Sequence, residues 1–136
     1  MTIKAGNCYL VETNRDSAGY INSHLLVVLL DPEERTNHTI IVPVDTLRSP
    51  KHDTTTILEP GIHEFITKRS YINYRFAKVR STSFIENLQK ENKAKIKDSL
   101  DAKVVDIIVE GLRKSDYTPE EVLSMYGYYM MRKIKK

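Results

Sequence analysis

Short apolar segments separated by polar turns fill the first 80 residues of the chain. The segment at residues 24–30 (HLLVVLL) is apolar throughout after its histidine, which predicts a strand that is buried on both faces. Residues 39–44 (TIIVPV) predict its partner, with Pro43 at an edge or a bulge because proline lacks a backbone donor. Shorter strands are predicted at residues 8–12 and 54–58, and polar loops at residues 13–23 and 45–53.

Residues 59–80 combine a histidine, cations and aromatic side chains more densely than any other stretch. The stretch opens with Glu59-Pro60-Gly61, which is a turn signal. From Tyr71 to Arg80 the pattern has the two-residue period of a strand. One face of this predicted strand carries Ile72, Tyr74 and Phe76, which we expect in the core, and the other face carries Asn73, Arg75 and Ala77.

Helical periodicity replaces strand alternation after Arg80. Ser83 is a candidate cap for a short helix through Gln89, and a lysine-rich connection follows at residues 91–97. Ser99 or Asp101 starts a second predicted helix. The last helix begins at Thr118-Pro119-Glu120-Glu121, where Thr118 and Glu121 have the spacing of a capping box. The apolar stripe of the second helix comprises Val104, Val105, Ile108 and Leu112, and that of the last comprises Val122, Leu123, Tyr126, Met130 and Ile134.

Strands followed by helices predict an α+β fold, with a small barrel or twisted sheet of about five short strands and two or three helices at one end. The 136 residues have the size of one domain with a helical appendage. The proportions of hydrophobic (40%) and charged (29%) residues are ordinary for a globular protein, so we expect little disorder.

Cys8 is the only cysteine, so no internal disulfide can form, which is typical of a cytoplasmic protein. The chain does not open on a signal-peptide pattern, and its longest apolar run, residues 25–30, is too short to span a bilayer. We therefore expect a cytoplasmic protein with no membrane association. The net charge of +3 permits an anionic partner without requiring one.

Several of these segments resemble the MazF/PemK-like toxins of type II toxin–antitoxin systems. Residues 6–11 (GNCYLV) resemble the opening glycine and strand of that family. Gly19 and residues 25–29 (LLVVL) resemble its next loop and buried strand. Residues 40–46 (IIVPVDT) are similar to its Val-Pro strand end, and residues 70–72 (SYI) and 76–79 (FAKV) to a later strand. The resemblance extends over residues 5–112.

The resemblance implies an SH3-like barrel with its helices over residues 1–112 and a C-terminal helical extension over residues 113–136. It also implies a homodimer that cleaves single-stranded RNA without metal or other cofactor, under the control of a cognate antitoxin. The usual catalytic arginine of the family falls at about His24, and the usual threonine at Asp45 or Thr46. The usual Arg-Pro at the strand start is absent here. The alternative is therefore a non-catalytic MazF-like module that binds nucleic acid or a protein partner.

Metal-free RNA cleavage requires a base, an acid and a cation that stabilises the phosphorane. Histidine exchanges protons near neutral pH, and arginine pairs with phosphate. The candidate catalytic residues are accordingly His24, His63, Asp45, Thr46 and Arg75. The candidate RNA-binding residues supply cations or stacking rings, and they are Tyr20, Lys68, Arg69 and Tyr71.

These residues also have structural interpretations. His24 opens a buried strand, where its ring can simply bind a backbone carbonyl. Asp45 is either a turn former or the group that orients the His24 imidazole. The histidines and the cysteine lack metal-ligand spacing. The last helix is either packed on the core or a partner surface for an antitoxin or a second subunit.

Overall fold

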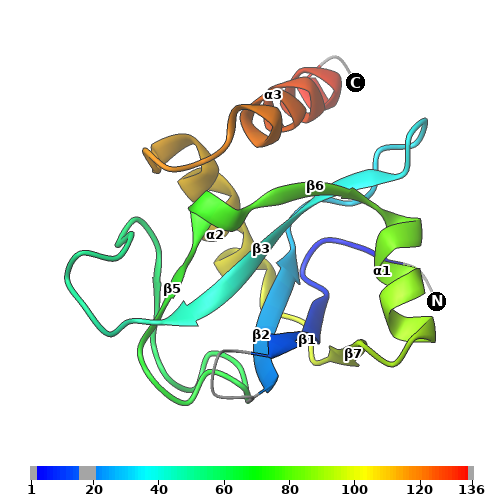
Figure 1. Cartoon of the computed structure of the whole chain (residues 1–136). Helices are drawn as coiled ribbons and strands as arrows, with labels where there is room; N and C mark the ends of the chain where they lie inside the picture. Colours follow the sequence, from blue (N-terminus) through cyan, green and yellow to red (C-terminus); the bar gives the residue numbers. More distant parts are fainter. Residues whose placement is uncertain (1–2, 16–20, 135–136) are drawn as a thin grey trace.

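The computed structural model describes residues 3–15 and 21–134 of the chain, and its core element is an antiparallel sheet. The strands are β1 (Cys8–Arg15), β2 (Ile21–Val28), β3 (His38–Thr46), β4 (Ile57–Leu58), β5 (Ser70–Ile72), β6 (Lys78–Ser81) and β7 (Ala94–Lys97). The helices are α1 (Thr82–Lys90), α2 (Ala102–Lys114) and α3 (Glu120–Ile134), and a 3₁₀ turn, η1 (Tyr74–Phe76), precedes β6. The predicted α+β class is thus confirmed (Figure 1).

The seven-stranded sheet has the order β4-β5-β3-β2-β1-β7, with β6 paired to the first half of β3. Every pairing is antiparallel. The sheet is open, because β4 and β7 lie at its two ends and do not pair with each other. β3 is the central element, since it pairs with β2 along one edge and with β5 and β6 in turn along the other.

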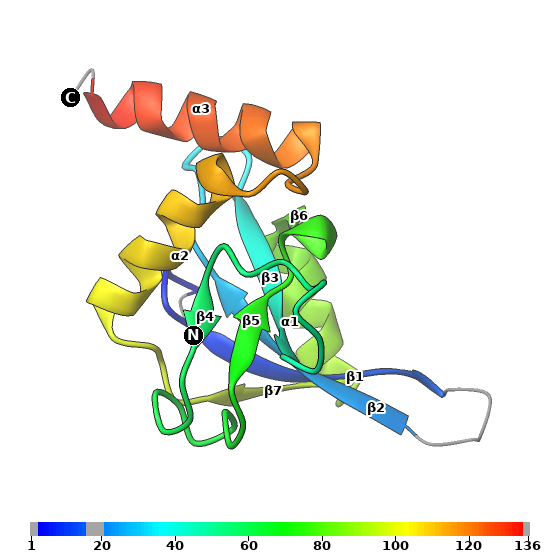
Figure 2. The ribbon, with the colours of Figure 1, turned by 90° about the vertical axis from the view of Figure 1, so that its left-hand side faces the viewer.

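Both faces of the sheet are covered, as the continuous apolar segments predict. On one face, Val27 and Val42 pack in a core that includes Ile108 of α2 and Val122 of α3. On the other face, Val28 and Ile41 belong to a second cluster, which also includes residues of β1, α1 and β7. In Figure 2, α2 and α1 accordingly lie on opposite sides of the sheet. The face covered by α1 carries the site described below.

Residues 71–80 do not form one strand, so the predicted period-two strand is wrong in detail. β5 ends at Ile72, η1 turns the chain, and β6 begins at Lys78. Ile72 and Tyr74 are buried as predicted, but Phe76 is 56% exposed because the turn rotates it out of the core. The turn lets the same stretch pair with two successive parts of β3.

Three strands include residues that the sequence predicted as loop or connection. β1 and β2 extend into the predicted loop at residues 13–23, whose residues 16–20 lie outside the described part. The predicted lysine-rich connection contains β7, which pairs with β1. Backbone pairing with neighbouring strands therefore makes these segments strands, although their polar composition predicted loops.

The helix boundaries follow local side-chain chemistry only in part. Ser81, rather than Ser83, caps α1 by accepting from the Phe84 backbone N–H. Asp101 caps α2, one of the two predicted starts. α3 begins after Pro119, but the buried Thr118 Oγ1 accepts no hydrogen bond, so the predicted capping box does not form. Of its predicted stripe, Val122 is buried and Leu123 is 38% exposed.

Candidate functional site

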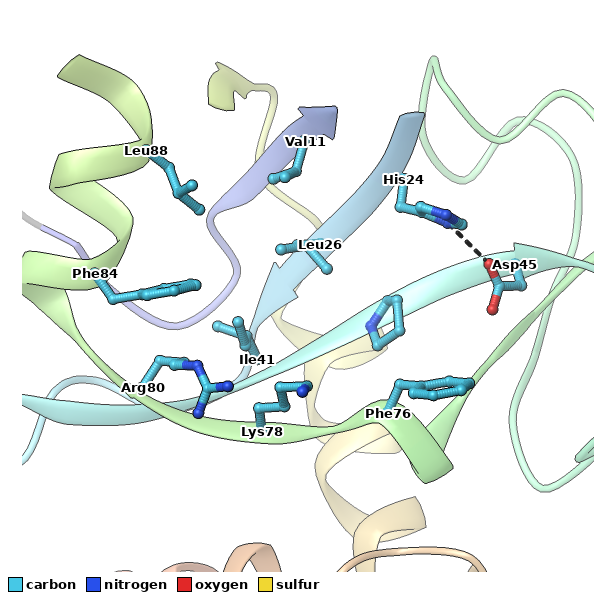
Figure 3. Close-up of a pocket in the computed structure, with 11 residues that line it drawn as sticks. Val11, His24, Leu26, Ile41, Asp45, Phe76, Lys78, Arg80, Phe84 and Leu88 are labelled. Carbon is cyan, nitrogen blue, oxygen red and sulfur yellow. Dashed lines mark hydrogen bonds and ion pairs between the residues drawn. The ribbon is translucent and has the colours of Figure 1, made fainter. Parts of the chain in front are cut away.

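His24 and Asp45 face each other across the β2–β3 pair. Leu25 is opposite Val44 in the antiparallel register, so the next residues outward are His24 and Asp45. Their side chains lie on the same face of the sheet, and His24 Nδ1 is 3.0 Å from Asp45 Oδ1 (Figure 3). Because an ionised carboxylate only accepts, Nδ1 carries the proton and Nε2 presents the lone pair. Nε2 has no hydrogen-bond partner among the described residues.

Asn73 holds the second oxygen of the same carboxylate. Its Nδ2 donates to Asp45 Oδ2 at 2.8 Å, and its backbone N–H donates to the Pro43 carbonyl at 3.1 Å. Asn73 directly follows β5, which places it beside β3. The Asp45 carboxylate thus accepts two hydrogen bonds, one from Asn73 and one from His24, and this pair of contacts fixes the imidazole plane.

The pairing shifts the pKa of both titratable groups in opposite directions. The hydrogen bond to Asp45 raises the pKa of His24, against the opposing effect of partial burial. The hydrogen bond from His24, with that from Asn73, lowers the pKa of Asp45 in spite of its desolvation. This is the arrangement in which a carboxylate strengthens an imidazole as a base.

A cavity of about 420 Å³ opens in front of the pair, between the sheet and α1. Its floor is apolar and comes from β1, β2, β3 and α1. One end holds the His24–Asp45 pair, and the lower side in Figure 3 carries Phe76, Lys78 and Arg80, with Phe76 at the same end as Asp45. The other apolar lining residues are Val11, Leu26, Ile41, Pro43, Phe84 and Leu88.

Two cations lie between two aromatic rings along one border of this cavity. Lys78 and Arg80 lie two residues apart on β6, so their side chains leave the same face of the strand. Phe76 precedes them, and Phe84 of α1 follows, with the Arg80 guanidinium 5.2 Å from its ring centroid. Both phenylalanines are exposed, at 56% and 39%. We call Phe76, Lys78, Arg80 and Phe84 the cationic–aromatic border.

A second cavity of about 250 Å³ adjoins the first and shares Phe76 with it. The His52 ring stacks on the Tyr71 ring, with centroids 4.7 Å apart and an interplanar angle of 14°. Arg75 lies 4.6 Å from the centroid of Tyr117, which belongs to the α2–α3 connection. The remaining lining residues are Lys51, Asp53 and Asn73.

His63 lies in neither cavity, and both of its ring nitrogens are occupied. Its side chain is buried, with Nε2 donating to the Asp98 carbonyl at 2.6 Å and Nδ1 accepting from the Phe65 backbone N–H at 3.1 Å. Because Asp98 precedes α2, this histidine ties the loop at residues 59–69 to the entry of that helix. The structure thus assigns His63 to loop packing instead of the predicted proton transfer.

The other predicted residues divide between the second cavity and remote positions. Arg75 and Tyr71 line the second cavity, although Tyr71 is buried and stacks on His52 instead of presenting a free face. Lys68 and Arg69 are exposed and line neither cavity, and Arg69 pairs with Glu59 at 2.8 Å. Thr46 is half-buried opposite Ser70 and lines neither cavity. Tyr20 lies outside the described residues.

Sequence reasoning missed several side chains that line these cavities. Phe76 was assigned to the core, and Asn73, His52, Lys78, Arg80 and Tyr117 were assigned no site role. The alternation of Lys78 and Arg80 after an aromatic residue was the available signal. Its meaning depends on η1, which separates this segment from β5.

A comparison of the chain with models of protein families finds no match, and a comparison with curated proteins finds none either. The described residues were also compared with the requirements of a membrane span and of a metal site. None of the helices in residues 3–15 and 21–134 combines the length and apolar character needed to cross a membrane. Within the same residues, no group of three His, Cys, Asp or Glu side chains is placed to hold a metal ion.

Proposed function

We propose that this protein is a toxin-like, metal-independent endoribonuclease that cleaves single-stranded RNA. The observation that carries the proposal is the His24–Asp45 pair, which is oriented by Asn73 and opens on a cavity with a cationic–aromatic border. The sheet with helices on both faces is compatible with an SH3-like barrel that is open between β4 and β7. The resemblance to MazF/PemK-like toxins points to the same reaction.

His24 is the general base of the proposed reaction. Its Nε2 takes the proton of a ribose 2′-hydroxyl, the 2′-oxygen forms a bond to phosphorus, and the bond between phosphorus and the 5′-oxygen breaks. The leaving 5′-oxygen takes a proton from water, so the products are a 2′,3′-cyclic phosphate and a 5′-hydroxyl. Asp45 stabilises the imidazolium that forms, because its carboxylate already accepts from Nδ1.

The cationic–aromatic border is the proposed binding surface for the RNA strand. Lys78 and Arg80 neutralise phosphates and stabilise the charge that develops on the phosphorane. Phe76 and Phe84 offer exposed rings on which bases stack without regard to their identity. The spacing of cations between aromatic rings is typical of surfaces that bind single strands.

Incubation of the purified protein with mixed single-stranded RNA in EDTA tests the proposal. We expect fragments with 2′,3′-cyclic phosphate and 5′-hydroxyl ends, and no cleavage by His24→Ala. Leu123→Ala is the matched control, since Leu123 is exposed on α3 and lines neither cavity. Intact RNA at micromolar wild-type protein, together with unaffected growth on expression, would refute the proposal.

A non-catalytic module is the second candidate, and the apolar floor of the first cavity favours it. Seven apolar side chains line that cavity beside two cations. An acidic segment with apolar side chains, such as an antitoxin, or the second subunit of a homodimer would complement this surface. If His24→Ala leaves growth inhibition unchanged while Lys78→Glu abolishes it, binding explains the effect and catalysis does not.

A further inference from the structure

The second cavity contains the elements of a site for a flat, hydrogen-bonding ring. The His52 imidazole is half-buried and is supported from behind by the stacked Tyr71 ring. The Arg75 guanidinium lies over Tyr117 and forms no ion pair among the described residues. One aromatic ring is thus backed by another, and the Arg75 guanidinium lies 4.6 Å from the centroid of a third ring, that of Tyr117.

The loop and the helix connection that form this cavity are held together by a network around Asp53. Asp53 Oδ2 accepts from Ser115 Oγ at 2.6 Å, and Asp53 Oδ1 accepts from the backbone and hydroxyl of Thr55 at 3.0 and 2.5 Å. Ser115 Oγ in turn accepts from the Tyr117 backbone N–H at 3.1 Å. Tyr117 and His52 therefore keep fixed positions although they come from segments far apart in the sequence.

The polar groups that face this cavity differ from those of a simple phosphate site. Arg75 presents a fork of N–H donors, which matches two adjacent acceptors on one edge of a ring. Asn73 uses its amide nitrogen for Asp45, which leaves its Oδ1 as an acceptor without a partner among the described residues. Guanine carries adjacent O6 and N7 acceptors, whereas adenine places an amino donor at the equivalent position.

We propose that the second cavity binds a guanine base, with the ring stacked on His52 and its O6 and N7 read by Arg75. Tyr117 acts as a positioning residue, because it holds the guanidinium and does not itself contact the base. The cavity shares Phe76 with the first cavity, and Asn73 joins it to Asp45. The inference rests on the proposed function in one respect, since it makes this base the neighbour of the scissile phosphate.

Titration of the full chain with nucleoside 5′-monophosphates tests the site without any cleavage step. We expect isothermal titration calorimetry to show that GMP binds roughly 10-fold or more tightly than AMP, because a bidentate arginine contact discriminates bases by about 1–3 kcal/mol. His52→Ala should weaken all nucleotides by roughly 5-fold or more, as expected for the loss of a stacking ring. Arg75→Met should remove the preference for GMP while the residual affinity for AMP persists.

Control variants separate base reading from general effects. Arg113→Met removes an exposed arginine of α2 that pairs with Glu110, and Tyr128→Ala removes a tyrosine that is 46% exposed, as Tyr117 is. Both should bind GMP as the wild type does, whereas Tyr117→Ala should narrow the ratio of GMP to AMP affinity. A ratio that stays unchanged in Arg75→Met would overturn the proposal, as would inorganic phosphate that binds as tightly as GMP.

Different results would refute the guanine site and the proposed nuclease activity. Selective GMP binding without RNA cleavage would refute the nuclease and leave the guanine site standing. RNA cleavage with no guanine at a fixed position beside the cut, and with no GMP preference, would refute the guanine site alone. Cleavage next to guanine in the wild type, with a guanine preference at the cut that Arg75→Met loses, would support both.

Discussion

Asn73 Nδ2 lies 2.8 Å from Asp45 Oδ2, the carboxylate oxygen that His24 does not use. Asp45 therefore receives one hydrogen bond from each side, from β2 through His24 and from the residue after β5 through Asn73. A carboxylate held in this way cannot rotate without losing one of them. The orientation of the His24 ring thus depends on three segments that meet only at the end of β3.

Removal of the imidazole should abolish most activity without unfolding the protein. His24 is half-buried at the edge of the cavity, so His24→Ala leaves no large void. We expect the rate of RNA cleavage to fall by about 10²–10⁴-fold, the usual contribution of a general base. Fluorescently labelled RNA measures the rate, and circular dichroism verifies the fold. A variant that retains a tenth or more of the rate would contradict the assignment.

The pH dependence of cleavage should report the His24–Asp45 pair. The base must be neutral, and the hydrogen bond to Asp45 raises the pKa of His24, so the rate should rise with pH through a value above the ordinary pKa of about 6.5. Asp45→Asn removes the carboxylate, so this limb should move to lower pH and the maximal rate should fall. If the rise of the rate with pH occurs at the same pH in Asp45→Asn as in the wild type, a group other than His24 controls it.

The same pair should stabilise the fold in a limited pH window. The raised pKa of His24 contributes stability that is fully present below about pH 6.5 and is lost as the pH rises through its folded-state value. The lowered pKa of Asp45 contributes stability that is present above about pH 3.9 and is lost as the pH falls through its folded-state value. Urea unfolding should therefore show a larger difference between wild type and Asp45→Asn at pH 5 than at pH 8. Equal differences would contradict the ion pair.

His63→Ala should weaken the fold, because its ring joins the loop at residues 59–69 to the start of α2. The Asp98 carbonyl and the Phe65 N–H would each lose the hydrogen bond that they form with the buried His63 ring. We expect a loss of about 1–3 kcal/mol in the free energy of unfolding, measured with urea. The control is His38→Ala, since the His38 side chain forms no hydrogen bond among the described residues. A cleavage defect in His63→Ala without a stability defect would reverse this assignment.

Gly111 of α2 should not tolerate a side chain. A Cβ at this position would overlap the Tyr74 hydroxyl and lie 2.6 Å from Tyr74 Cζ. Tyr74 cannot easily move, because it is fully buried and its hydroxyl donates to the Ile108 carbonyl at 2.7 Å. Gly111→Ala should lower the free energy of unfolding by about 1–3 kcal/mol. Gly127→Ala, which meets no atom within 4 Å, should instead be neutral or stabilising by up to about 1 kcal/mol.

The α+β class and the burial of most of residues 25–30 follow from the sequence, because periodicity and apolar runs are local signals. His24 and Asp45 were candidates because histidine and aspartate can transfer or orient a proton, and because the resemblance to MazF/PemK-like toxins implies a catalytic pair at about these positions. His63 was indistinguishable from His24 at that level. Each is a single histidine between one polar and one apolar neighbour, and nothing local shows that the Asp98 carbonyl will reach one of them.

Only the tertiary structure decided which of these groups meet. The register of β2 against β3 places His24 opposite Asp45, and a shift of one residue would put the two side chains on opposite faces. The turn η1 separates β5 from β6, so Phe76 leaves the core and joins Lys78 and Arg80 on the cavity border. The contact of Arg75 with Tyr117 joins positions 42 residues apart in the chain, 75 and 117. Such contacts arise from the packing of whole elements, whereas periodicity describes one element at a time.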